Sequence, residues 1–112
     1  MIAHICLYKL KPEITPERLE EMMSLTRVHL LRVPEALAVR TGKRVSDDAA
    51  WNWFVFIEVE SLDKLAILKD DPHYIKFREE VLKPSVKELK SGAPEECVQS
   101  FEMEPRKDVK YS

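Results

Sequence analysis

Residues 3–10 read AHICLYKL, and this stretch has the composition of a buried β-strand. Successive residues of a strand point to opposite sides of the sheet, so His4, Cys6 and Tyr8 share one face. The residues between them form the other face, which is apolar as well. A small sheet covered by helices on one side only normally alternates apolar and polar residues. Because this strand does not alternate, we expect helices to cover one face and a second surface to cover the other.

The rest of the chain predicts further strands and helices in a recognisable order. One helix has Thr15 as its N-cap and Pro16 at its first position, where the missing N–H costs nothing. Pro84 lies inside the last helix and should kink it or divide it in two. The expected elements are a strand at 3–10, a helix at 16–32, strands at 36–43 and 51–60, helices at 61–69 and 72–90, and a strand at 97–103.

This order, βαββαβ with the second helix broken, predicts a ferredoxin-like α+β sandwich. The elements account for residues 1–104 as one domain, and a polar C-terminal tail follows at 105–112. A chain of 112 residues is long enough for a single modest core of this kind.

Composition and charge exclude several classes of function. The net charge of -2 favours neither nucleic acid nor a membrane as a partner, and 2 glycines are too few for a glycine-rich phosphate loop. No apolar run approaches the ~20 residues that a membrane span needs. No Cys/His spacing resembles a zinc site, so we expect no metal and no cofactor. Cys6 and Cys97 should face opposite sides of the sheet, which precludes a bridge between them and makes the cytoplasm the default location.

The second apolar face of the sheet predicts self-association. On a single chain it would expose a set of apolar side chains, namely Ala3, Ile5, Leu7, Phe54, Phe56 and Phe101. A patch of this size on a small protein normally marks an interface. We therefore expect a symmetric homodimer in which the two sheets pack face to face.

Several short motifs, taken in order along the chain, resemble those of one known family. They are His4-Ile5-x-Leu7-x-Lys9-Leu10-Lys11, Thr41-Gly42-Lys43-x-Val45, Val59-Glu60-Ser61, Asp71-Pro72-His73-Tyr74 and Phe101-Glu102. Together they resemble the stress-responsive A/B barrel (Dabb) family over nearly the whole chain. The resemblance implies a ferredoxin-like α+β fold and a homodimer whose two sheets form a central barrel. Many members of the family have no assigned reaction.

A plant polyketide cyclase of this family implies where a site would lie. It uses no cofactor, and its pocket between helices and sheet holds a histidine of a His-Pro-x-His motif and an aspartate of the last strand. By this resemblance His4 corresponds to the strand histidine and Glu102 to the last-strand carboxylate. Tyr74 occupies the position of the catalytic histidine. His73 would take that role if the motif slipped by one residue. Adjacent helical residues diverge by about 100°, so His73 and Tyr74 cannot both enter one pocket.

The candidate site residues form two groups. The catalytic candidates are His4, Tyr74 and Glu102, and the candidates that would line a ligand pocket are Trp53, His73 and Phe77. Structural roles remain open for them, because Tyr74 and Phe77 lie on one apolar helical stripe and a pair of His4 with Glu102 would also serve as a buried hydrogen bond.

Two functions fit these candidates. The first is a module that binds a small apolar molecule without turnover. The second is a cofactor-independent enzyme of the cyclase, isomerase or lyase type, acting on a carbonyl-rich or polyketide-like substrate by proton transfer. In it His4 and Glu102 would exchange protons and Tyr74 would donate a hydrogen bond. The missing histidine at position 74 favours the binding module.

Overall fold

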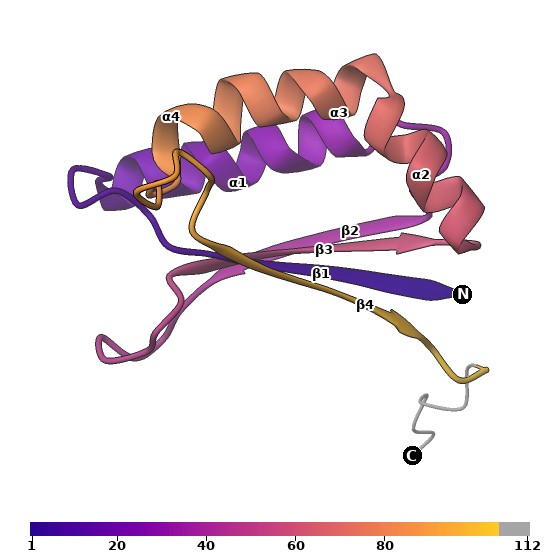
Figure 1. Cartoon of the computed structure of the whole chain (residues 1–112), viewed down its shortest axis with the longest axis horizontal. Coiled ribbons are helices and arrows are strands. Elements are labelled where there is room, and N and C mark those ends of the chain that lie inside the picture. Colours follow the sequence, from indigo (N-terminus) through magenta and orange to yellow (C-terminus); the bar gives the residue numbers. More distant parts are fainter. Residues whose placement is uncertain (106–112) are drawn as a thin grey trace.

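The computed structural model describes residues 1–105, and these form a four-stranded antiparallel sheet with helices on one face (Figure 1). In sheet order the strands are β2 (Ala38–Lys43), β3 (Trp53–Val59), β1 (Ile2–Tyr8) and β4 (Glu96–Glu102). The helices are α1 (Pro16–Leu30), α2 (Leu62–Asp70), α3 (Pro72–Phe77), the π-helix η1 (Arg78–Leu82) and α4 (Lys83–Ser85). This architecture is the predicted ferredoxin-like α+β fold.

The polar tail predicted at 105–112 lies, beyond its first residue, outside the described residues. In the part of the chain that is described, no helix combines the length and the apolar character that a membrane span requires.

Strand β1 lies inside the sheet, and the two sides of the sheet differ as predicted. Cys6 and Tyr8 are buried beneath the helices. No helix of residues 1–105 covers the other side (Figure 1), and there Ile5 is half-buried while Phe101 is 54% exposed. Ala3 departs from the expectation, because its small side chain is already buried within the single chain. The uncovered side is therefore an open apolar surface.

Gly42 shapes this open surface. A Cβ atom at this position would lie 2.5 Å from Cε1 of Phe54 on the neighbouring strand. Glycine lets the aromatic ring pack directly across the backbone of β2. The side chain of Phe54 is thus held along the uncovered side of the sheet.

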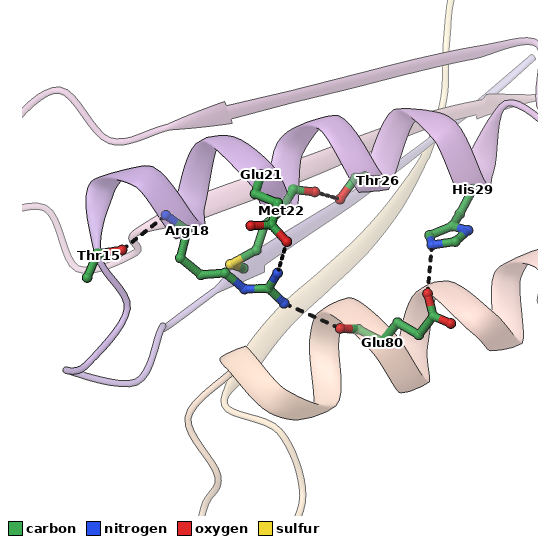
Figure 2. Close-up of polar contacts among 7 residues, drawn as sticks. All are labelled: Thr15, Arg18, Glu21, Met22, Thr26, His29 and Glu80. Atoms are coloured by element: carbon green, nitrogen blue, oxygen red, sulfur yellow. Dashed lines mark hydrogen bonds and ion pairs between the residues drawn. The ribbon is translucent and has the colours of Figure 1, made fainter.

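Helix α1 begins as predicted. Thr15 Oγ1 accepts a hydrogen bond from the backbone N of Arg18 at 3.1 Å, and Pro16 is the first helical residue. Inside the helix, the hydroxyl of Thr26 donates to the carbonyl of Met22 at 2.7 Å, which satisfies a buried polar group (Figure 2). The buried side of α1 consists of Met22, Met23, Thr26, His29 and Leu30.

Contacts around Glu80 join α1 to η1 (Figure 2). Nε2 of His29 lies 3.2 Å from the carboxylate of Glu80, and Nη2 of Arg18 donates to the backbone carbonyl of Glu80 at 3.5 Å. That carbonyl lacks its usual helical donor because Pro84, four residues later, has no N–H. The N–H of Lys83 instead bonds five residues back, which forms the π-helix. The predicted division at Pro84 does not occur, because the backbone stays helical from Phe77 to Lys83 and the lost bond is absorbed as a π-helical turn before the proline.

The helix predicted to continue to residue 90 ends at Ser85, so that boundary was wrong. The N–H of Lys87 donates to the carbonyl of Lys9 at 2.8 Å, and the N–H of Lys9 donates to the carbonyl of Glu95 at 3.1 Å. Residues 86–95 therefore lie beside the end of β1. These long-range backbone bonds outweigh the helical propensity of the Lys- and Glu-rich segment.

Candidate functional site

A cleft of about 550 Å³ lies on the helix side of the sheet, over β1 and β4. It lies there because α1 packs on β2 and α2 on β3, whereas β4 diverges from the helical layer (Figure 1). Val98, which points to the helix side from β4, is accordingly 41% exposed. The volume is in the range of ~300–1,000 Å³ that is typical of small-molecule pockets.

Three parts of the chain form the walls of the cleft. The strands contribute the floor, which consists of His4, Cys6, Tyr8, Glu96 and Val98. The helices contribute one wall, which consists of Lys69, Tyr74, Arg78, Glu79, Leu82 and Lys83. The segment after α4 closes the end of the cleft with Val86, Glu88, Gly92 and Pro94.

His4 is a neutral hydrogen-bonding group in the floor. Its side chain is buried, and Nδ1 lies 2.8 Å from Oγ of Ser100, the residue directly opposite on β4. Burial, together with the positive charge of Lys69, lowers the pKa of His4 from 6.5 to about 4. The imidazole is therefore uncharged at neutral pH. Because Nδ1 is engaged by Ser100, Nε2 is the ring nitrogen that remains for a ligand.

The other interior groups are also uncharged at neutral pH. Burial raises the pKa of Tyr74 to about 12 and the pKa of the Cys6 thiol to about 11. Burial also raises the pKa of Tyr8 well above its ordinary value of 10.0. Each of these groups keeps its proton, so the phenols can donate hydrogen bonds but cannot act as bases.

Charged side chains occupy the edge of the cleft. Glu96 lies opposite Tyr8 in the strand register, and burial raises the pKa of its carboxyl group while Arg78 and Lys69 oppose that rise. On the helical wall, Lys83 Nζ lies 3.4 Å from the carboxylate of Glu79, so these two charges are paired.

The cleft brings together two of the three predicted catalytic residues. His4 lies in its floor and Tyr74 in its helical wall. Glu102 does not line the cleft; it is exposed and lies opposite Ile2 in the register. The expected pair of His4 with Glu102 is therefore replaced by the bond from His4 to Ser100, which the register places directly across the strand.

The three predicted pocket residues lie outside the cleft. Trp53 and Phe77 are core residues with 2% and 1% exposure, and Nε1 of Trp53 donates to Oγ1 of Thr41 at 2.7 Å. His73 is half-buried at the start of α3, where its backbone N donates to Oδ1 of Asp71 at 2.8 Å. Of the two adjacent candidates it is thus Tyr74, and not His73, that faces the cleft.

Glu96, Lys69 and Arg78 were missed by sequence reasoning. Glu96 was placed before the last strand, although β4 begins at this residue. The pattern of β4 could have identified it, since Glu96 has the same parity as Val98. No local signal could have joined Lys69 and Arg78 to it, because they come from α2 and η1. Within residues 1–105, no three or more His, Cys, Asp or Glu side chains form a group that could hold a metal ion.

The family follows from a match that covers most of the chain. The family model of the stress responsive A/B barrel domain, Dabb, matches residues 2–91. The chain belongs to the Dabb family. The matched segment includes β1 and all helices of this Dabb domain, so it contains the helical wall of the cleft and part of its floor. Strand β4, with Glu96 and Val98, lies beyond it. No curated protein matches the chain.

Solved structures share the fold of this Dabb domain. A protein from Arabidopsis thaliana has a TM-score of 0.75 at 18% identity, over 95% of this chain and 98% of that one. A protein from Thermobifida fusca, described as dimeric, ferredoxin-like and of unknown function, has a TM-score of 0.75 at 16% identity, over 91% and 90%. The hydroxynitrile lyase of Passiflora edulis has a TM-score of 0.68 at 13% identity, over 94% of each chain. Identities this low show the fold alone.

Proposed function

We propose that this Dabb domain binds a small, mainly apolar molecule in its cleft without turnover, as one protomer of a homodimer. The observation that supports binding is the state of the groups inside the cleft. His4, Cys6, Tyr8 and Tyr74 are all neutral at neutral pH, and burial moves each of their pKa values away from that pH.

These pKa values favour binding over proton transfer. A general acid or base works best when its pKa lies near the operating pH. His4, with a pKa of about 4, is a weak base, and Tyr74, with a pKa of about 12, is a weak acid. Both remain good hydrogen-bonding partners for a carbonyl or hydroxyl group. A few oriented polar groups in an apolar cleft are what small-molecule sites typically provide.

A melting screen of aromatic and polyketide-like compounds tests the binding proposal. Val98→Trp should fill the cleft from the exposed strand β4, whereas Val45→Trp places the same side chain on a fully exposed loop residue as the control. We expect compounds that raise the melting temperature of the wild type and of Val45→Trp but not of Val98→Trp. Compounds that stabilise all three proteins equally, or none of them, would refute the proposal.

The homodimer is supported by the uncovered side of the sheet. Phe54, Phe56 and Phe101 contribute apolar surface there, and none of the helices in the described part of the chain covers it (Figure 1). The Thermobifida fusca neighbour and other proteins of this fold are described as dimeric. Packing of two such sheets would cover both apolar surfaces.

Sedimentation velocity tests this arrangement. Phe56→Asp buries an unpaired charge in the proposed interface, so we expect it to weaken dimerisation by a factor on the order of 100. Val45→Asp, a charge of the same kind outside the interface, should leave a dimer. A wild type that sediments as a monomer at micromolar concentration would contradict the homodimer.

A cofactor-independent enzyme is the second candidate function. Its support is the placement of His4 and Tyr74 in one cleft, together with a protein of the same fold, the Passiflora edulis enzyme, that is a hydroxynitrile lyase. Tyr74 would donate to a carbonyl oxygen and His4 would accept a proton through Nε2. Consumption of a stabilising compound by the wild type but not by His4→Ala, measured by mass spectrometry, would favour this function over simple binding.

The cytoplasm is part of the proposal as the place of action. Cys6 and Cys97 are both free thiols, and in the strand register Cys97 lies opposite Leu7, on the uncovered side of the sheet. Two unpaired cysteines that cannot reach one another are common in reducing compartments.

A further inference from the structure

Two cations at the edge of the cleft have no counter-ion in contact. Lys69 lies in the last turn of α2 and Arg78 at the start of η1, and both line the cleft. Among residues 1–105, neither side chain has a carboxylate within 4.0 Å, whereas Lys83 on the same wall is paired with Glu79 at 3.4 Å. The cleft thus contains both a paired cation and two unpaired ones.

The charges that face these cations come from three acidic residues. Glu79 is matched by Lys83, and Glu88 is exposed in the segment that closes the far end of the cleft. Glu96 is the carboxylate on the strand floor, and it is close enough to both cations for their charges to act on it. Lys69 and Arg78 therefore face one carboxylate between them, and one positive charge at this side of the cleft is unmatched.

The remaining lining complements a molecule with an acidic group at one end. Val98 on the floor and Leu82 and Val86 on the opposite side supply apolar surface. Tyr74, which lies between the two cations in sequence, supplies a phenol that can donate a hydrogen bond. A carboxylate that accepts from cationic donors and a phenol gains charge-assisted hydrogen bonds, which are the strong class in proteins.

We propose that Lys69 and Arg78 bind the carboxylate of the ligand, so that the molecule held in the cleft is an amphipathic organic acid. Its apolar body lies along Leu82, Val86 and Val98. This inference rests on the proposed binding function of the cleft, and it adds the chemical class of the ligand.

Calorimetric titration with matched acids and amides tests the inference. The probes are 2-naphthoic acid with 2-naphthamide and decanoic acid with decanamide, since each pair differs only in charge at one end. We expect the wild type to bind at least one acid roughly tenfold more tightly than its amide, because hydrogen bonds to charged groups are stronger than those between neutral groups.

Charge-removing variants locate the effect. Lys69→Gln and Arg78→Gln should each weaken binding of the acid about fivefold to tenfold and leave binding of the amide unchanged. Lys69→Arg keeps the charge and should keep the preference for the acid. Lys43→Gln removes a cation that is paired with Glu20 outside the cleft, and it should change neither affinity.

The possible outcomes separate this inference from the proposed function. If amides bind as tightly as acids, or if Lys43→Gln has the same effect as Lys69→Gln, the inference is overturned and the binding function stands. If the wild type binds no member of either pair and no compound of the melting screen, the binding function fails together with the inference. Compounds of the screen that bind only when they are uncharged also overturn it.

Discussion

The two halves of the helix side of the sheet are built from similar strands but have different surroundings. Over β2 and β3 the helices close on the sheet, and Trp53 is buried against Tyr8 with ring centroids 5.0 Å apart. On the other half, β4 diverges from the helical layer (Figure 1), and the cleft lies over β1 and β4. In the closed half Trp53 donates to Thr41, whereas in the open half Tyr74 lines the cleft and His4 bonds to Ser100 through one ring nitrogen only. The extent of the helical layer therefore separates core residues from candidate site residues.

The largest expected difference between the two halves is the loss of stability when a side chain is truncated to alanine. Trp53→Ala should destabilise the protein by about 4 kcal/mol, because it leaves a cavity under the helices. Val98→Ala, in the open half, should cost only about 0.5 kcal/mol, because no helix packs on that residue. Urea unfolding followed by circular dichroism measures both. Similar losses in the two variants would mean that the open half is packed as tightly as the core.

A pH dependence at His4 is the next largest effect. The pKa of His4 is lowered from 6.5 to about 4 in the folded protein, so between these values the unfolded chain binds a proton that the folded protein does not. Stability should be complete above pH 6.5 and fall as the pH drops toward 4. We expect the free energy of unfolding to fall by about 2 kcal/mol. The full shift, at ~1.4 kcal/mol per pKa unit, would give a larger loss, but water in the open cleft screens the charge.

The measurement compares the wild type with His4→Gln, which cannot titrate. The unfolding free energy of each protein is measured at about pH 7 and about pH 4.5. The wild type should lose more than the variant on acidification, so the difference between the two proteins should change with pH. Carboxylates titrate in both proteins and cancel in the difference. A difference between the two proteins that stays constant with pH would show that His4 is not held neutral by burial.

A smaller difference in stability is expected when a hydroxyl group is removed from each half. Thr41 accepts from Trp53 and donates to the carbonyl of Phe54 at 2.8 Å, so Thr41→Val should leave two buried groups unpaired and cost about 1.5 kcal/mol. Ser100→Ala removes the partner of His4, but water in the cleft can replace it, so the cost should be about 0.5 kcal/mol. Thermal unfolding of the two variants ranks them, and a reversed ranking would contradict the difference between the halves.

Much of the fold could be predicted from local sequence, and the reasons are visible in particular residues. The two-sided apolar pattern of β1 and the cap at Thr15 depend on neighbours along the chain, and both are confirmed. The helix end at Ser85 could not be predicted in this way, because it depends on backbone bonds from Lys11 to Ser85 and from Lys87 to Lys9. Propensity does not register a partner that is some 75 residues away in the chain.

The candidate site was predictable only in part, for the same reason. His4 and Tyr74 follow from strand parity and from a motif position, which are local. Glu102 was expected beside His4, but the register of β4 against β1 places Ser100 there. Lys69 and Arg78 come from α2, which packs on β3, and from η1, which packs beside α1. Local sequence patterns do not predict that these two elements meet at one cleft.

A titration followed by heteronuclear NMR tests most directly whether the open half of the sheet binds a small molecule. The titrant is the compound that most stabilises the wild type in the melting screen. Binding in the cleft predicts saturable shifts of the signals of His4, Tyr74 and Val98, with the signals of Gly42 and Phe54 unchanged. Shifts centred on Gly42 and Phe54, or no saturable shift at all, would contradict a binding site in the cleft.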